Sequence, residues 1–260
     1  MKKKTKRIII VSVAATVTAL TVAGLVSIKP LKIKNYQKEP LELPIGFTIT
    51  AHAGALNTKA NTPESIKAGL DFVEMGSVEV DVRFDAQKNI VLSHDTVKGS
   101  GKHTTLAEAL ELLKTYPARM NLDLKEITDV AAVQKLADAN FITPQLFFTG
   151  VSAAQAELVR KEAPRIPFYI NESIPKGERT DSAYLETMAQ QLKGMGAVGI
   201  NLNYKEVSEE LVVTMHNYNL LVSVWTVDDK EDMCKMLRLG VDNITSKNPD
   251  VLKDLMQNWG

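Results

Sequence analysis

"FTITAHAGALNTKANTPESIKAGLDFVEMGSVEVDVRF", residues 47–84, contains two runs rich in β-formers with a helical pattern between them. The runs "FTITAH" (47–52) and "SVEVDVRF" (77–84) predict strands. The stretch between them predicts a helix that begins after Thr62 as N-cap, with Pro63 at the first helical position. Strand, helix and strand in this order form a β-α-β unit, from which parallel sheets are built.

The same alternation continues toward the C-terminus. Helical patterns such as "TLAEALELLKTY" separate six further β-rich runs, which are "RMNLDLK" (119–125), "QLFFTG" (145–150), "IPFYIN" (166–171), "AVGINLN" (197–203), "LLVSVWTV" (220–227) and "VDNITS" (241–246). Eight β-α units in about 210 residues predict an α/β fold, a (β/α)₈ TIM barrel. A doubly wound open sheet is the alternative.

One extra strand interrupts this count. The run "NIVLSHD", residues 89–95, follows the second strand too closely for a helix to intervene, and the turn "DAQKN" before it predicts a β-hairpin. If the turn centres near Gln87 and Lys88, His94 lies opposite Asp81. Glu79 is two residues away on the same face, because side chains alternate along a strand.

Ionisable residues gather at the predicted C-terminal ends of the first three barrel strands, where the chemistry of such barrels takes place. The six are His52 on the first strand, Glu79 and Asp81 on the second, His94 on the hairpin, and Asp123 and Lys125 on the third. Each of them alone has a simpler explanation as a solvated or paired side chain. Their convergence at one end of consecutive strands predicts a functional site.

The residue types in this set suit phosphate chemistry. Carboxylates are ligands that Ca²⁺ and Mg²⁺ prefer, so Glu79, Asp81 and Asp123 predict a divalent-metal site. Two histidines beside such an ion can act as general base and general acid, and a lysine can neutralise an anionic substrate. Phosphoryl transfer fits this combination, because its catalysis depends mainly on positioning and charge stabilisation.

Several motifs occur in an order that resembles the glycerophosphodiester phosphodiesterase family, within the phosphatidylinositol phospholipase C-like barrel superfamily. They are "AHAG", "NTPES", "GSVEVDVRFDAQKNIVLSHD", "TLAEALELL" and "MNLDLK". Near the C-terminus, "VSVWTVDDKEDMCKMLRLGVDNITSKNPDVL" is similar to the family's Trp-Thr-Val ending and its Gly-Val-Asp turn. The resemblance covers about residues 47 to 255.

This resemblance implies a metal-dependent hydrolase that acts on glycerophosphodiesters and releases an alcohol. It implies roles for seven residues: His52 and His94 as catalytic histidines, Glu79, Asp81 and Asp123 as metal ligands, Lys125 facing the phosphate, and Trp225 lining the substrate pocket. For Trp225, a place in the barrel core is an equally good interpretation.

The chain departs from the family pattern at four places. His52-Ala53-Gly54 stands where the family usually has His-Arg-Gly, and Ala60-Asn61-Thr62 stands for Glu-Asn-Thr. Asp123 replaces a glutamate. The stretch after His94 is too short for the small cap that usually covers the site. We therefore expect retained catalysis with altered substrate recognition, and a pocket open to larger or lipid-linked head groups.

Two other functions remain open from the sequence. One is a phospholipase C- or D-like enzyme that acts on intact lipids or on a phosphate-bearing wall polymer. The other is a degenerate barrel that binds phosphate-containing ligands without turnover, which the alanines at 53 and 60 motivate.

The N-terminal segment predicts membrane attachment. Residues 1–7 carry five positive charges, and residues 8–28 carry none. At about 1.5 Å a residue, the uncharged run is long enough to span a bilayer core, and a cleaved signal peptide is the alternative. The basic tail places the N-terminus in the cytoplasm, so that the barrel, residues 47–260, lies outside it on a linker of residues 29–46. We expect a single-pass cell-membrane protein, or a secreted one after cleavage.

Charge and cysteine content exclude other classes. Since five of the 31 basic residues lie in the basic tail, 26 remain against 31 acidic residues, a net charge of −5 for the body. This argues against a nucleic-acid partner. A single cysteine, Cys234, excludes an intrachain disulfide and a thiolate metal cluster, and its helical context predicts a packed thiol.

Overall fold

The computed structural model describes residues 35–74, 76–98 and 101–260. The predicted basic tail (1–7), the predicted anchor (8–28) and the first part of the predicted linker lie outside these residues. No helix within the described ranges combines the length and the apolar composition that a membrane crossing requires. The anchor therefore stays a prediction from the sequence.

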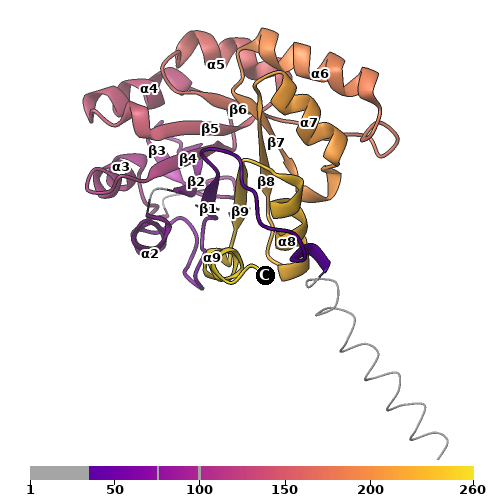
Figure 1. Cartoon of the computed structure of the whole chain (residues 1–260). Helices are drawn as coiled ribbons and strands as arrows, with labels where there is room; N and C mark the ends of the chain where they lie inside the picture. Colours follow the sequence, from indigo (N-terminus) through magenta and orange to yellow (C-terminus); the bar gives the residue numbers. More distant parts are fainter. Residues whose placement is uncertain (1–34, 75, 99–100) are drawn as a thin grey trace, which may run out of the picture.

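In the described chain, eight parallel strands close into a barrel surrounded by helices (Figure 1). The hydrogen-bonded order is β1-β9-β8-β7-β6-β5-β4-β2, and the pairing of β1 with β2 closes the ring. The strands are β1 (Thr48–Ala51), β2 (Ser77–Phe84), β3 (Ile90–Leu92), β4 (Arg119–Leu124), β5 (Leu146–Val151), β6 (Phe168–Asn171), β7 (Gly199–Asn203), β8 (Leu221–Trp225) and β9 (Asn243–Ser246). The predicted TIM barrel is confirmed, because an open sheet has no closing pair.

One α-helix follows each barrel strand within the described residues and covers the outside of the sheet (Figure 1). The helices are α2 (Pro63–Val73), α3 (Leu106–Leu113), α4 (Val130–Ala139), α5 (Ala156–Glu162), α6 (Ser182–Met195), α7 (Glu209–Asn217), α8 (Lys230–Leu239) and α9 (Pro249–Gln257). Short 3₁₀ helices span Thr143–Gln145, Ala153–Gln155 and Tyr204–Glu206. Cys234 is fully buried in α8, and burial raises the pKa of its thiol to about 11, so it is the packed thiol that the sequence predicts.

Local sequence signals set where the helices begin. The Thr62 hydroxyl accepts a hydrogen bond from the Ser65 amide at 3.2 Å, which confirms Thr62 as the N-cap of α2 with Pro63 after it. In α3, Thr105 and Glu108 form a reciprocal capping box. Both helices therefore start at positions that their own sequences specify, which holds the loops before them in place.

The faces of each strand separate an apolar core from a polar interior. On β2, Val78, Val80 and Val82 are buried toward the helices. The inward faces of the barrel instead carry buried polar residues, which include Thr50, Ser77, Asn121, Asn201, Ser223 and Asn243. Asn243 donates to the Ser223 hydroxyl at 3.0 Å, and Ser223 donates to Asn201 at 2.9 Å. A hydrogen-bonded polar layer thus lies inside the barrel.

The predicted hairpin is present, but the predicted register is wrong by one residue. Strand β3 pairs antiparallel with β2, with Val82 opposite Leu92, and the Ser93 amide donates to the Asp81 carbonyl at 2.9 Å. Asp81 therefore lies opposite Ser93 rather than His94. The reason is the turn, in which Lys88 adopts a left-handed backbone with φ of 64°, so that the loop centres on Gln87 alone.

The segment before β1 docks on the barrel at the end where the strands begin. Trp259, just after α9, donates to the Glu39 carbonyl at 3.0 Å, and Arg238, in the last turn of α8, donates to the Pro40 carbonyl at 3.1 Å. Figure 1 shows this segment in indigo beside α8. Because α8 and α9 run antiparallel to the strands, the C-terminal ends of these helices lie where the strands begin. The segment before β1 therefore contacts the barrel at the end opposite the C-terminal strand ends.

We predict that Gly199→Ala destabilises the barrel by more than about 2 kcal/mol, since core overpacking has effects of this size. A Cβ atom at Gly199 would lie only 2.1 Å from the Leu221 carbonyl oxygen on the neighbouring strand. Urea unfolding followed by circular dichroism measures the change. Gly194→Ala is the matched control: it lies in α6 with nothing within 4 Å of the new atom. It should be neutral or stabilising, and equal losses in both variants would contradict the overpacking explanation.

Candidate active site

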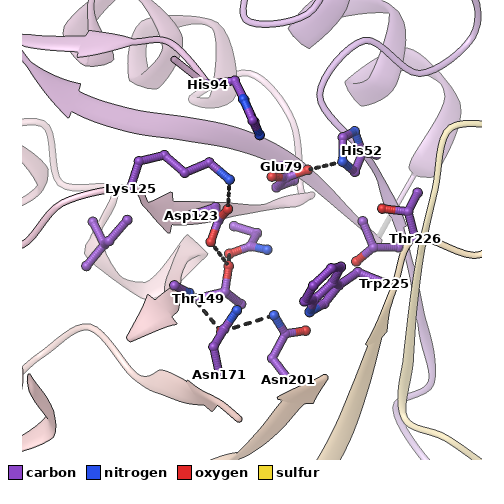
Figure 2. A pocket seen from close by; sticks show the side chains of 14 residues that line it. His52, Glu79, His94, Asp123, Lys125, Thr149, Asn171, Asn201, Trp225 and Thr226 are labelled. Carbon is purple, nitrogen blue, oxygen red and sulfur yellow. Dashed lines mark hydrogen bonds and ion pairs between the residues drawn. The ribbon is translucent and has the colours of Figure 1, made fainter. Parts of the chain in front are cut away.

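A cavity of about 460 Å³ opens at the C-terminal ends of the strands (Figure 2). Six of the seven residues that the sequence predicts line it: His52, Glu79, His94, Asp123, Lys125 and Trp225. The seventh, Asp81, is 2% exposed and contacts Lys125. The barrel therefore brings all seven predicted site residues together.

Three carboxylates cluster at one side of this cavity, which we call its charged half. Oxygen atoms of Glu79, Asp81 and Asp123 all lie within 4.8 Å of one another. Asp81 on β2 is in register with Asp123 on β4, so their side chains emerge side by side on the same face. Glu79 precedes Asp81 by two residues and shares its face. Ligand spacing suited to one hard cation thus follows directly from the parallel register.

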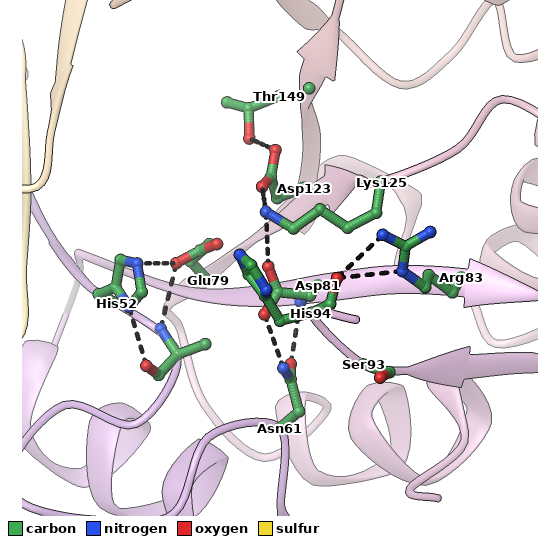
Figure 3. A network of polar contacts seen from close by, with 12 residues as sticks. His52, Asn61, Glu79, Asp81, Arg83, Ser93, His94, Asp123, Lys125 and Thr149 are labelled. Atoms are coloured by element: carbon green, nitrogen blue, oxygen red, sulfur yellow. Dashed lines mark hydrogen bonds and ion pairs between the residues drawn. The ribbon is translucent and has the colours of Figure 1, made fainter. Parts of the chain in front are cut away.

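Lys125 is the cation that balances this cluster in the structure (Figure 3). Its ammonium group contacts Asp81 at 2.8 Å and also contacts Asp123. Burial opposes its charge, but the two carboxylates outweigh burial and raise the pKa of Lys125 above its ordinary value. With all three carboxyls ionised, one lysine leaves two negative charges uncompensated, which fits a divalent cation.

Glu79 is the most strongly perturbed carboxyl of the cluster. Burial raises its pKa to about 7; the nearby Asp123 and Asp81 charges act in the same direction, whereas His52 lowers it. Its Oε2 atom accepts a hydrogen bond from the Ala53 amide at 3.1 Å and lies 3.7 Å from Nε2 of His52. A bound cation would therefore stabilise a carboxylate that is otherwise difficult to ionise.

The ring of His52 has a defined orientation. Its Nδ1 atom lies 2.8 Å from the Ala53 carbonyl oxygen. Because a carbonyl oxygen can only accept, Nδ1 carries the hydrogen of this bond. Nε2 is then the nitrogen on the Glu79 side, beside the cavity, where it can take or deliver a proton. The strand-end histidine is thus oriented by the backbone of the residue that follows it.

The backbone of His94 is held by a side chain of the neighbouring strand (Figure 3). Arg83 donates from Nε and Nη2 to the His94 carbonyl at 3.1 and 2.9 Å. Its Nη1 atom lies 3.6 Å from Glu126, which follows Lys125 directly. The His94 side chain is 71% exposed, with Nδ1 3.0 Å from Asp95. Arg83 therefore brings His94 to the cavity although the strand register does not.

Asn61 is a site residue that sequence reasoning missed. It is buried, donates to Oδ2 of Asp81 at 2.6 Å and accepts from the Asp81 amide at 2.9 Å. It also adopts a left-handed backbone with φ of 60°, which asparagine tolerates better than most residues. The available signal was its place in "NTPES", directly before the N-cap of α2.

The opposite half of the cavity is uncharged, and sequence reasoning identified only Trp225 there. Trp225 is 37% exposed and lines the cavity, so the alternative position in the barrel core is wrong. The missed residues of this half are Thr149, Asn171, Asn201 and Thr226. Asparagines within buried strands were the signal, since asparagine is depleted in strands.

The family profile described as "Glycerophosphoryl diester phosphodiesterase family" matches residues 106–251, more than half of the chain. The chain belongs to this family. The predicted resemblance is thereby confirmed, and the acidic cluster and histidines of this family member occupy the C-terminal end of its barrel.

Two relatives and one solved structure illustrate the relationship. A glycerophosphodiester phosphodiesterase from Caldanaerobacter subterraneus is 22% identical over 82% of this chain and 98% of its own length. GDPD4 from Arabidopsis thaliana is 26% identical over 62% of this chain, which spans about half (48%) of that relative. An Oleispira antarctica phosphodiesterase, solved with the product sn-glycerol-3-phosphate, superposes with a TM-score of 0.63 at 19% identity, over 83% and 98% of the two chains. This last likeness shows the fold.

We predict that Asn61→Asp weakens divalent-metal binding by roughly 10- to 100-fold, as loss of a ligand-orienting partner usually does. The new carboxylate would replace the amide that donates to Asp81 and would repel it. Calorimetric titration of the purified chain with Ca²⁺ and with Mg²⁺ gives the affinities.

Asn57→Ala is the control for Asn61→Asp, because Asn57 has a similar left-handed backbone (φ of 59°) but is exposed. It should leave metal affinity unchanged. Unaltered binding in Asn61→Asp would show that Asp81 needs no such partner.

Proposed function

We propose that this family member is a divalent-metal-dependent phosphodiesterase that hydrolyses glycerophosphodiesters, with His52 and His94 exchanging protons. The observation that carries this proposal is the convergence of two histidines, three carboxylates and one lysine around one cavity. A fold that had only kept a binding role would not need proton-transfer groups on both sides of a cation site. The degenerate barrel is therefore the weaker hypothesis.

The reaction breaks the P–O bond to the alcohol. A new P–O bond forms to water, or first to a neighbouring hydroxyl of the substrate and then to water. One group removes the proton of the nucleophile and another protonates the departing alkoxide. His52, with Nε2 beside the cavity, and the exposed His94 are the two proton carriers in the cavity wall. Lys125 lies where it can face the negative phosphoryl oxygens.

The cofactor that fits is a hard divalent cation, Ca²⁺ or Mg²⁺. The oxygen-only donor set and its two uncompensated negative charges support this assignment. Glu79, Asp81 and Asp123 would hold the ion, which when bound polarises a phosphoryl oxygen. Without the ion, Asn61 already orients Asp81, and the Ala53 amide orients Glu79.

A larger or polymeric phosphodiester is a second candidate substrate. Only thirteen residues, 93–105, separate β3 from α3. This stretch is short for a cap domain over the cavity. The cavity can therefore admit a diester whose substituents extend beyond its mouth. A phosphate-bearing wall polymer is such a diester, and its hydrolysis would use the same cavity and the same chemistry.

The proposed location is the cell membrane, with the barrel on the outer side, or secretion after cleavage. Support comes from the uncharged run of residues 8–28 and the basic tail before it. The docked segment around Glu39 and Pro40 lies at the strand N-termini, opposite the cavity. An anchor preceding it favours a cavity that faces away from that bilayer. This geometry favours water-borne or wall-bound diesters over lipids of the anchoring membrane.

For the chain from residue 30 onward, we predict turnover of glycerophosphodiesters and of an aryl phosphodiester with Ca²⁺ or Mg²⁺, and none with EDTA. His52→Ala and His94→Ala should each lower kcat by at least about 100-fold, the usual size of a general acid–base contribution. Alcohol release and ³¹P NMR provide the readouts, and a cyclic phosphate would identify attack by the substrate's own hydroxyl.

The control for the histidine variants is His216→Ala, because His216 pairs with Asp242 outside the cavity lining. It should keep its turnover. Metal binding without turnover of any diester would overturn the enzymatic proposal and favour the degenerate barrel.

We predict that the full-length protein in phosphatidylglycerol vesicles cleaves water-soluble glycerophosphoglycerol at least about tenfold faster than the lipids of its own vesicle. The reason is the position of the docked segment opposite the cavity. Lipid phosphate release is measured beside soluble substrate turnover. Faster cleavage of the vesicle's own lipid would reverse the assignment in favour of the phospholipase-like alternative.

A further inference from the structure

The two most exposed large apolar side chains of the described chain lie at the end of the barrel opposite the cavity. Ile45 is fully exposed and Phe141 is 92% exposed, whereas the remaining large apolar side chains of the described residues are at most 52% exposed. Ile45 precedes β1, and Phe141 lies between α4 and β5. Segments that lead into the strands of such a barrel lie where the strands begin. We call this end the strand-start face; it also carries the partly exposed Leu221, the first residue of β8.

Phe141 occupies a backbone position that glycine usually fills. It directly follows the C-cap of α4 with φ of 57°, and the Ile142 amide donates to the Ala137 carbonyl at 3.1 Å. This is a Schellman-type helix end, whose left-handed residue is usually glycine. Helices α6 and α8 of the same chain end on Gly196 and Gly240 in that conformation. Phenylalanine there adds backbone strain and exposes a ring to water, so stability of the fold does not explain it.

Ile45 lies at the tip of a tight turn. The Phe47 amide donates to the Pro44 carbonyl at 3.0 Å, and Gly46 has φ of 87°, the left-handed value that the third residue of a type II turn requires. Glycine, proline and short polar residues dominate such turns. Phe47 packs against the core directly after the turn. Ile45 is therefore a fixed apolar projection from the strand-start face.

Charged residues distinguish the two ends of the barrel. Six of the eight helices carry acidic residues in their first turn, at the cavity end. Basic residues in the last turns of α5, α6 and α8 lie at the strand-start face, namely Arg160, Lys161, Lys193 and Arg238. Two carboxylates near this face are paired, Glu74 with Lys253 and Asp138 with Arg165. An anionic lipid surface would therefore repel the cavity end and accept the strand-start face.

The sequence before the described residues indicates which surface this face meets. The predicted anchor ends at residue 28, and the described chain begins at residue 35, a separation that the chain can span by at most about 25 Å. No acidic residue occurs before Glu39, and basic residues next to a membrane span attract anionic lipids. Those after the predicted span are Lys29, Lys32, Lys34 and Lys38. Since the segment around Glu39 is docked at the strand-start face, the bilayer of the anchor is within reach of that face.

We propose that the strand-start face rests on the bilayer that holds the anchor, with Phe141 and Ile45 inserted among the lipid head groups and the cavity turned away. This inference rests on the proposed membrane location and does not depend on turnover. Both side chains gain free energy when they leave water. A second copy of the chain fits less well, because the anchor keeps the bilayer beside every molecule whatever the protein concentration.

Helix α6 offers labelling positions at the two ends of the barrel. Gly177 lies in the loop before α6 and Gly194 in its last turn; both are exposed, and a Cβ atom at either meets nothing within 4 Å. Cys234 is fully buried, so a cysteine introduced at either position is the one that reacts with an NBD maleimide. At about 1.5 Å a residue, the helix that separates the two labels is roughly 20 Å long.

The test uses the full-length protein, labelled at Gly194→Cys or Gly177→Cys, in vesicles of phosphatidylcholine and phosphatidylglycerol. Nitroxide-labelled head groups quench NBD that lies near the bilayer surface. Quenching should be at least about threefold stronger at position 194 than at position 177, because a docked face lies within roughly 10 Å of the head groups. Phosphatidylcholine alone should reduce this difference, since it removes the anionic lipid.

Phe141→Gly is the decisive variant, because it should weaken docking without weakening the fold. Glycine relieves the left-handed strain, so the midpoint of urea unfolding should stay equal or rise. The ratio of quenched to unquenched label at position 194 should fall at least about tenfold, the size expected when a buried phenyl ring is removed. Ile45→Ser should lower the ratio in the same way. Val213→Ser is the matched control: it removes an exposed apolar side chain from the middle of α7 and should keep the ratio.

The remaining outcomes separate docking from anchoring. Equal quenching at both positions, in protein that floats with the vesicles, would overturn docking and keep the anchor. Protein that does not float with them would overturn the membrane location and docking together. An unchanged ratio in folded Phe141→Gly would also contradict the proposal. A blue shift of the label at position 194 that grows with protein concentration in detergent would assign the face to a second copy instead.

Discussion

Three clustered carboxylates on β2 and β4, two of which pair with the Lys125 ammonium group, are the constraint around which the C-terminal end of the barrel is organised. Buried negative charge is costly unless it is paired and hydrogen-bonded. Each carboxylate accordingly has a donor: Ala53 for Glu79, Asn61 for Asp81 and Thr149 for Asp123. These donors come from separate loops and strands. The cluster therefore ties together segments that the barrel topology alone would only bring near one another.

The close approach beside Asp123 shows how little freedom this arrangement leaves. Gly150 has a φ of 75°, and a Cβ atom there would lie 2.7 Å from Oδ1 of Asp123 and 2.4 Å from the Leu124 carbonyl. Only glycine fits both the backbone and the space. Its amide in turn donates to Asn171. One residue thus connects the charged half of the cavity with the uncharged half.

Sequence patterns predicted most of the fold because they are local. Period-two runs, the Thr62 cap and the turn before residues 89–95 each depend on neighbours within a few positions. The same locality explains the errors. The hairpin register was wrong by one residue, because the left-handed conformation of Lys88 is a choice between turn geometries that sequence signals do not separate. Asn61 was missed because its partner, Asp81, is twenty residues away.

The sequence by itself determined the alternation of strands and helices, and with it the end of the barrel at which His52, Glu79, Asp123 and their neighbours meet. Residue type and spacing suffice for that, since parallel strands align their C-termini. Only the tertiary structure decided which groups touch. It decided that Lys125 bridges two carboxylates, that Arg83 holds the His94 backbone, and that a polar layer fixes the Asn171 amide. Those contacts depend on angstrom-scale register and side-chain direction across distant strands, which no local pattern encodes.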